Sequence, residues 1–109
     1  MLNAKEEFLK HIGNRKVLCA TVSHRDLINT DYKLIVGHSY EEYDKFMESL
    51  DFEYYPGYGA QELFGIIWYI DGTWSTRGEY DGSEWWENHL RPQIPKDLNP
   101  KWVEPTHIR

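Results

Sequence analysis

Residues 63–80 have the sequence LFGIIWYIDGTWSTRGEY, in which two strand-like runs, 63–70 and 73–80, flank Asp71-Gly72. Both runs are rich in β-branched and aromatic residues, which favour strands. An Asp-Gly pair between two such runs is the strongest local signal for a β-hairpin with a two-residue type I′ turn. We therefore expect an antiparallel hairpin, with its first strand inside a sheet and its second strand nearer an edge.

A two-residue turn would also fix which residues face each other across this hairpin. It would pair Ile70 with Thr73 and Ile67 with Thr76. Because side chains alternate between the two faces of a strand, this register assigns every side chain to one face. One face is predicted to carry Leu63, Ile67, Tyr69, Trp74, Thr76 and Tyr80, and the other Phe64, Ile66, Trp68, Ile70, Thr73, Ser75, Arg77 and Glu79.

A helix is predicted before the hairpin, over residues 39–50. Ser39 followed by Glu42 has the spacing of a capping box, in which each side chain satisfies a backbone N–H group at the start of the helix. Apolar residues then recur at helical spacing, which predicts one buried face. These residues are Tyr43, Phe46, Met47 and Leu50.

The first third of the chain predicts one more helix and two strands. Asn3 can cap a short helix that Gly13 would end. Residues 16–24 carry apolar side chains on both faces, the pattern of a strand that is covered on both sides or nearly so. Residues 31–37 have the composition of a second strand, most simply antiparallel to the first.

The chain after the hairpin is expected to contain little regular structure. Asp81-Gly82-Ser83 predicts a turn, followed by one or two helical turns over residues 83–89. Prolines 92, 95, 100 and 105 exclude a regular helix or a central strand beyond that point. The Pro92–Pro95 spacing fits either a strap across the domain, anchored by Ile94 and Trp102, or a ligand for an SH3-type domain.

These segments together predict an α+β fold with the element order α-β-β-α-β-β. We expect a four-stranded, mostly antiparallel sheet with its helices largely on one face. Residues 1–95 would form a single domain, and residues 96–109 an extended C-terminal arm that contains two prolines. The length of 109 residues is enough for one core and too short for two.

Composition excludes several classes of protein. The single cysteine, Cys19, cannot form an internal disulfide, and the first residues lack the apolar segment of a signal peptide, which predicts a cytoplasmic protein. The longest apolar run, residues 63–70, is too short to cross a membrane. A net charge of −6 disfavours direct contact with nucleic acid phosphates.

No motif for a metal, a nucleotide or another cofactor is present, so none is expected. The five histidines occur singly, without metal-ligand spacing, and the chain lacks both glycine-rich phosphate-binding motifs. Cys19 has no base placed to activate it and is expected to be a small buried residue. The histidines are His11, His24, His38, His89 and His107.

The candidate functional residues cluster between residues 51 and 87, where eight carboxylates face a single cation, Arg77. Arg77 is expected to be the hub of a polar network. Trp85 and Trp86 are adjacent, so they cannot both point into a core, and an exposed tryptophan among carboxylates suits a cationic partner. The other candidates are Glu79, Asp81 and Glu84 beside Arg77, and Tyr54, Tyr55 and Tyr58 in a glycine-containing loop.

The stretch GYGAQELFGIIWYIDGTWSTRGEYDGSEWWENHLRPQIP, residues 57–95, resembles small phage- and prophage-encoded proteins of unknown function. The shared features are a glycine-rich turn, an Ile-Trp strand, the Asp-Gly hairpin, an R-x-E-Y-D-G-x-E-W-W run and a P-x-I-P ending. Some of those proteins carry a cysteine where this chain has Arg91, so thiol chemistry would not apply here. The resemblance implies a protein that binds and blocks a host protein, such as a nuclease of a CRISPR or restriction system.

The sequence is therefore compatible with three functions. The first is a non-enzymatic module that binds a basic host protein through the acidic, tryptophan-containing residues and the tyrosine loop. The second is a small-molecule binder or small hydrolase that uses Arg77 to orient an anion and Glu79 or Asp81 to move protons. The third is a structural phage protein, which would form a defined homo-oligomer.

Overall fold

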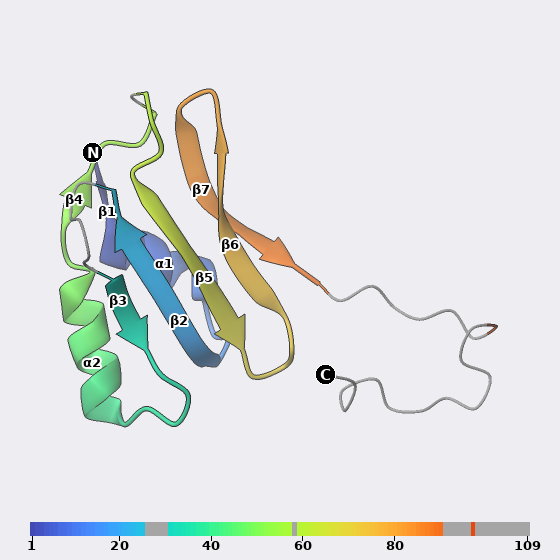
Figure 1. Ribbon diagram of the computed structural model, residues 1–109. Helices are drawn as coiled ribbons and strands as arrows, with labels where there is room; N and C mark the ends of the chain where they lie inside the picture. Colours follow the sequence, from blue (N-terminus) through green and yellow to red (C-terminus); the bar gives the residue numbers. More distant parts are fainter. Residues whose placement is uncertain (26–30, 58, 91–96, 98–109) are drawn as a thin grey trace.

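The computed structural model describes residues 1–25, 31–57, 59–90 and 97, and it has the predicted α+β architecture (Figure 1). Five antiparallel strands form one sheet in the order β3-β2-β5-β6-β7, and two very short strands, β1 and β4, pair separately. The helices are α1 (Ala4–Ile12) and α2 (Tyr40–Ser49). The strands are β1 (Leu2–Asn3), β2 (Val17–His24), β3 (Asp31–Leu34), β4 (Glu53–Tyr54), β5 (Leu63–Tyr69), β6 (Trp74–Tyr80) and β7 (Ser83–His89).

Both helices begin at the predicted capping residues. The Asn3 side chain accepts a hydrogen bond from the Glu6 backbone N–H at 3.0 Å. At α2 the capping box is complete, because the Ser39 hydroxyl accepts from the Glu42 N–H at 3.1 Å and the Glu42 carboxylate accepts from the Ser39 N–H at 3.0 Å. These bonds satisfy N–H groups that have no partner inside the helix.

The two helices cover the same face of the sheet, and the core lies between them and the strands (Figure 1). Phe8 of α1 and Ile67 of β5 are fully buried there. A smaller cluster of Ala4, Tyr54 and Leu63 lies beneath the short β1–β4 pair. The main core consists of Phe8, Ile12, Ala20, Val22, Leu34, Phe46, Met47, Leu50, Ile67, Tyr69 and Trp86.

The β5–β6 hairpin is confirmed, but the predicted turn and register are wrong by one residue. Trp68 faces Trp74, and Ile67 faces Ser75. The Gly72 N–H donates to the Tyr69 carbonyl and the Tyr69 N–H donates to the Thr73 carbonyl, so the loop has three residues. A type I′ turn would need a positive φ at Asp71, whereas only Gly72 has one, at 88°.

The physical reason for this turn lies in the side chain of Asp71. Its carboxylate accepts hydrogen bonds from the Thr73 N–H at 2.9 Å and from the Thr73 hydroxyl at 2.6 Å. These bonds favour the bulged turn, with glycine alone in the left-handed region. The shift by one residue moves every β6 side chain to the opposite face from the predicted one.

The type I′ turn occurs instead at the second Asp-Gly pair, Asp81-Gly82, and it creates a strand that was not predicted. Both residues have positive φ, 51° and 86°, and Tyr80 faces Ser83 directly across the turn. The segment expected to form helical turns is therefore β7, the edge strand of the sheet. Its side chains alternate between exposed and buried from Ser83 to Trp86, which is the period of a strand.

The sheet has one covered face and one open face. Contrary to the prediction for residues 16–24, β2 is covered by helices on one side only, with Ala20 and Val22 buried and Thr21 half-buried on the other side. The predicted C-terminal arm, including Pro92–Pro95 and Trp102, lies outside the described residues except for Asp97. No helix in the described part of the chain is long and apolar enough to cross a membrane.

Candidate binding surface

The predicted site residues on β6 and β7 are divided between the two faces of the sheet. Arg77 faces Trp86 and Glu79 faces Glu84, and all four are on the face that the helices cover. Trp85 points to the open face, where it is 39 % exposed, whereas Trp86 is only 7 % exposed. The predicted acidic and aromatic cluster is therefore split into two groups of residues, one on each face of the sheet.

Arg77 is the hub of a polar network, as predicted, but its partners differ from those that the sequence suggested. Its Nη2 atom donates to Glu84 Oε1 at 2.6 Å and to the Tyr54 hydroxyl at 3.2 Å. Its Nη1 atom forms an ion pair with Glu7 Oε2 at 3.2 Å. Glu79 instead accepts a hydrogen bond from the Gly82 N–H, so it fixes the turn.

Glu84 links this network to the backbone. Its two carboxylate oxygens accept hydrogen bonds from the N–H groups of Glu62, at 2.7 Å, and Leu63, at 3.0 Å. The side chains of Arg77 and Glu84 are 1 % and 0 % exposed, so neither can contact a ligand from solvent. Among the described residues, the Nε and Nη1 atoms of Arg77 have no hydrogen-bond partner, and Nη1 is held only by the ion pair with Glu7. Removing one partner of a buried charge pair is strongly destabilising, which indicates a structural role for this pair.

Tyr54 and Glu7 complete the network from two other elements. The Tyr54 hydroxyl donates to the Glu7 carboxylate. Burial, reinforced by this bond to Glu7, raises the pKa of Tyr54, so its hydroxyl keeps its proton. Burial alone would lower the pKa of Arg77, but the charge of Glu7 and the bonds from its other partners raise it, so the guanidinium stays charged.

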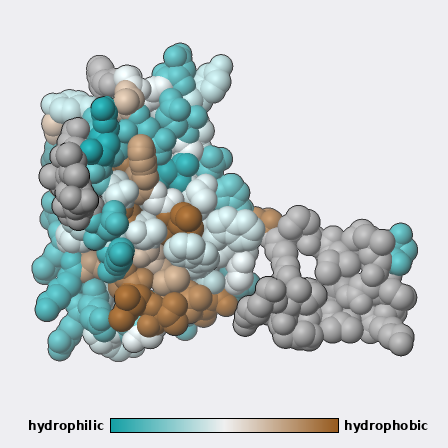
Figure 2. Space-filling model, in the orientation of Figure 1, coloured by the Kyte–Doolittle hydropathy of each residue, from teal (hydrophilic) through white to brown (hydrophobic). Residues whose placement is uncertain are grey.

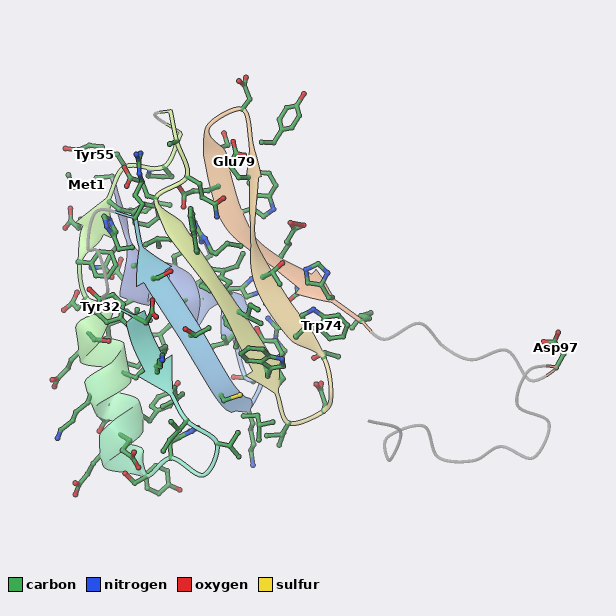
Figure 3. The ribbon with its side chains drawn as sticks, viewed as in Figure 1. Met1, Tyr32, Tyr55, Trp74, Glu79 and Asp97 are labelled. Carbon is green, nitrogen blue, oxygen red and sulfur yellow. The ribbon has the colours of Figure 1, made fainter. Side chains whose placement is uncertain are left out.

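The tyrosine loop lies beside the β6–β7 turn. A side chain at Gly82 would meet backbone atoms of Gly59 and Gly57, so the two segments are in contact. Tyr55 is 54 % exposed, and Figure 3 shows it at the same end of the sheet as Glu79. Tyr58 lies outside the described residues. Of the predicted tyrosines, Tyr54 is buried and Tyr55 is more than half exposed.

The open face carries an aromatic surface that the predicted register concealed. We define the aromatic face as Phe64, Trp68, Trp74 and Trp85, from strands β5, β6 and β7. Phe64, Trp68 and Trp85 are each 39 % exposed, and Trp74 is half-buried with its ring stacked on His89 at 5.7 Å. Figure 2, which views this side of the sheet, shows pale and hydrophobic residues in the middle, hydrophilic residues above and beside them, and a hydrophobic strip along the lower edge.

Sequence reasoning missed Trp68 and Trp74 as candidate residues. Because the predicted register was shifted by one residue, it placed them on opposite faces, whereas they face each other directly. Trp68 and Trp74 are each three residues from Asp71, the centre of the loop Ile70-Asp71-Gly72, and this equal spacing would have predicted that they face each other across a three-residue loop. In Figure 3, Trp74 lies at the opposite end of β6 from Glu79.

Trp85 and Glu87 form a mixed aromatic and acidic pair on the open face. They are two residues apart on β7, and a side-chain carbon at Gly78 would overlap both the Trp85 indole N–H group and the Glu87 carboxylate. Both side chains therefore lie over the bare backbone of Gly78. The arrangement offers a ring face and a negative charge side by side, which suits an Arg or Lys side chain.

Within the ranges that the structure describes, no group of three His, Cys, Asp or Glu side chains could hold a metal ion. Cys19 is half-buried on the open side of β2, and burial raises the pKa of its thiol, which disfavours a reactive thiolate. Comparisons of the chain with protein-family models, with curated proteins and with solved structures find no match.

Proposed function

We propose that this protein is a non-enzymatic protein-binding module that docks a basic segment of a partner on the open face of its sheet. The observation that carries the proposal is the aromatic face, in which Phe64 and Trp68 of β5 and Trp85 of β7 are each 39 % exposed. Exposed clusters of large apolar side chains are uncommon on proteins without a partner. Tryptophan also contributes more often than most residues to the energy of interfaces.

Charge argues for a basic partner. Glu87 lies beside Trp85 over Gly78, and Asp81 lies in the exposed turn at the end of the same hairpin. The chain has a net charge of −6, so its field favours the approach of a positively charged molecule. An Arg side chain placed on Trp85 would gain both a ring contact and an ion pair with Glu87.

The resemblance to phage- and prophage-encoded proteins suggests the identity of the partner. Under this proposal the partner is a bacterial host protein, such as a nuclease of a CRISPR or restriction system, and binding blocks its activity. Such nucleases carry basic surfaces that bind nucleic acid phosphates, which an acidic protein can occupy in place of the nucleic acid. A small acidic chain with a preformed aromatic surface suits that competition.

The test is the purification of a partner and the measurement of its affinity for defined variants. Protein captured from a bacterial lysate would be identified, purified and titrated by calorimetry at low and high salt. We expect Trp85→Ala to weaken binding by at least tenfold, because it removes an exposed aromatic contact without disturbing the core. Glu87→Lys should lower the affinity more at low salt than at high salt, because salt screens the repulsion between the new lysine and the basic partner.

Matched variants decide the outcome. Tyr40→Ala, on an exposed residue of α2, should leave the affinity unchanged. A partner that binds the Trp85→Ala and wild-type proteins equally well would overturn the proposal. A defined homo-oligomer whose contact is lost in Trp85→Ala would also overturn it, and would favour the structural phage protein instead. The hydrolase alternative gains no support here, because Arg77 is closed to solvent.

A further inference from the structure

An open pocket of about 640 Å³ is lined by residues from the end of the sheet opposite the β6–β7 turn, and its lining includes Ile70, two residues beyond Trp68 of the aromatic face. Three connections meet there: the loop from α1 to β2, the start of α2 and the β5–β6 turn. Its volume is within the range of pockets that bind small molecules. The lining residues are Arg15, Lys16, Val17, His38, Ser39, Tyr40, Tyr43 and Ile70.

The pocket carries positive charge in an otherwise acidic protein. Lys16 has no carboxylate within 4.0 Å in the described part of the chain, so its ammonium group has no ionic partner there. The Arg15 guanidinium forms its hydrogen bonds and its ring contact with neutral groups. These groups are the carbonyls of His11 and Ile12, the side-chain oxygen of Asn88 and the ring of Tyr69. The Arg15 charge also acts on a carboxylate, that of Asp71, whose pKa is lowered by bonds from Thr73 and by this charge.

The carboxylates next to the pocket are already engaged. Glu42 accepts a hydrogen bond from the Ser39 N–H at the start of α2. Asp71 accepts two hydrogen bonds from Thr73. Both carboxylates keep their charge, but neither forms an ion pair with Lys16 within the described residues. The start of α2 is capped by Ser39 itself, so the charge in the pocket comes from side chains and not from the helix.

The remaining walls are aromatic and aliphatic. The His38 ring stacks on Tyr43 at 5.9 Å, and its Nδ1 atom is 2.8 Å from the Ile35 carbonyl, which fixes the ring against the pocket wall. Tyr40 is 93 % exposed. Three aliphatic side chains in these connections, Ile35, Val36 and Ile70, are each more than half exposed, and Ile70 lines the pocket. Figure 2 shows a hydrophobic strip along the lower edge of the molecule.

We propose that this pocket binds a small amphipathic anion, an aromatic or branched aliphatic carboxylate or phosphate ester. The anionic head contacts Lys16, within the field of the fixed Arg15 charge. The apolar body lies against Tyr40, Tyr43 and Ile70. The pocket residues differ from those of the aromatic face, so this proposal does not rest on the protein-binding function.

The proposal is tested with naphthalene-2-carboxylate and its neutral counterpart, naphthalene-2-carboxamide, titrated into the ¹⁵N-labelled protein at pH 7. We expect saturable shifts of amide signals from the pocket residues, with the carboxamide binding about tenfold more weakly because it lacks the charge. Lys16→Gln should weaken the carboxylate about tenfold and leave the carboxamide unchanged. Lys33→Gln, the same change on the distant strand β3, should alter neither affinity.

Three results would overturn the proposal. Equal affinities for the carboxylate and the carboxamide would show that charge is not recognised. Shifts confined to Trp68 and Trp85 would place the probe on the aromatic face. The third result comes from vesicles of phosphatidylcholine and phosphatidylglycerol mixed with the protein. If the protein sediments with the vesicles but does not bind the free carboxylate saturably, the pocket residues form a membrane surface site and not a pocket for a free anion.

Discussion

Trp85 and Trp86 are neighbours on β7, yet they lie on opposite faces of the same sheet. Trp86 is 7 % exposed and packs edge-on against Phe8 at 5.7 Å, beneath helix α1. Trp85 is 39 % exposed and lies beside Glu87, and neither α1 nor α2, the helices of the described residues, covers it. The alternation of a single strand thus sends one tryptophan to the core and the other to a surface that can receive a partner.

Charges differ between the two faces in the same way. On the covered face, the Glu84 carboxylate forms an ion pair with Arg77 and accepts hydrogen bonds from two backbone N–H groups, and its side chain is not exposed to solvent. On the open face, the exposed Glu87 carboxylate lies beside a ring and can reach a ligand. The comparison teaches that a cluster of acidic and aromatic residues in the sequence contains both structural and recognition residues, and that the face of the strand decides which is which.

The largest expected effect comes from exchanging the two tryptophans for alanine in turn. Trp86→Ala should lower the free energy of unfolding by about 4–5 kcal/mol, because it leaves a cavity between α1 and the sheet and removes the ring beside Arg77. Trp85→Ala should lower it by about 1 kcal/mol or less. Urea denaturation followed by circular dichroism measures both, and equal losses would contradict the assignment of the two faces.

The next effect concerns the buried charge. Glu84→Gln should destabilise the protein by about 3 kcal/mol, since Arg77 loses its closest charge partner and an amide group is turned toward two backbone N–H donors. Glu87→Gln is the matched change on the open face of the same strand, and it should alter stability by less than about 0.5 kcal/mol. The same denaturation experiment tests this pair, and a loss below about 1 kcal/mol in Glu84→Gln would mean that the network is not structural.

A smaller effect is expected at the turns that set the register of the two faces. Gly82→Ala should cost about 2 kcal/mol, because φ is 86° and the new methyl group would press on the Gly59 backbone, with contacts at 3.3 Å. Gly72→Ala should cost only about 1 kcal/mol, because its φ of 88° is equally strained but no atom lies within 4 Å. Thermal unfolding compares them, and the reverse order would contradict the contact between the tyrosine loop and the β6–β7 turn.

Local signals in the sequence predicted most of the elements but not their register. The capping box at Ser39 and the hairpin around Asp71-Gly72 depend on residues a few positions apart, and both are present. The choice between two kinds of Asp-Gly turn depends on the side chain that follows the glycine. At the first turn the Thr73 hydroxyl donates a hydrogen bond to Asp71, whose φ is not positive. At the second turn Ser83 follows the glycine, and Asp81 has a positive φ of 51°. A difference of one residue in the first loop exchanged the faces of β6.

Local sequence patterns did not predict the partners of Arg77 in the polar network, for a different reason. Arg77 was identifiable as a hub because it is the only cation among eight carboxylates in residues 51–87. Its partners Tyr54 and Glu7 are 23 and 70 positions away, and only the packing of α1 and β4 against the sheet brings them together. Charge spacing in the sequence therefore favoured Glu79, which the fold uses for the turn.

The smallest predicted effect is a pH dependence at the border of the covered face. The His11 ring lies 6.2 Å from Trp86, and its Nε2 atom is 2.8 Å from the Ser75 hydroxyl. Burial, and then the charge of Arg15, lower the pKa of His11 below its ordinary value of 6.5. The unfolded chain therefore binds this proton more tightly, so the contribution of His11 to stability is complete above pH 6.5 and falls as the pH drops below it.

Replacing the histidine isolates this contribution from those of the carboxylates. The His11→Asn protein should lose less stability than the wild-type protein between pH 7.5 and pH 5.5, because the variant has no proton to take up at this position. Urea midpoints at the two pH values measure the difference, and identical losses in wild-type and His11→Asn proteins would show that the ring titrates freely at the edge of the covered face.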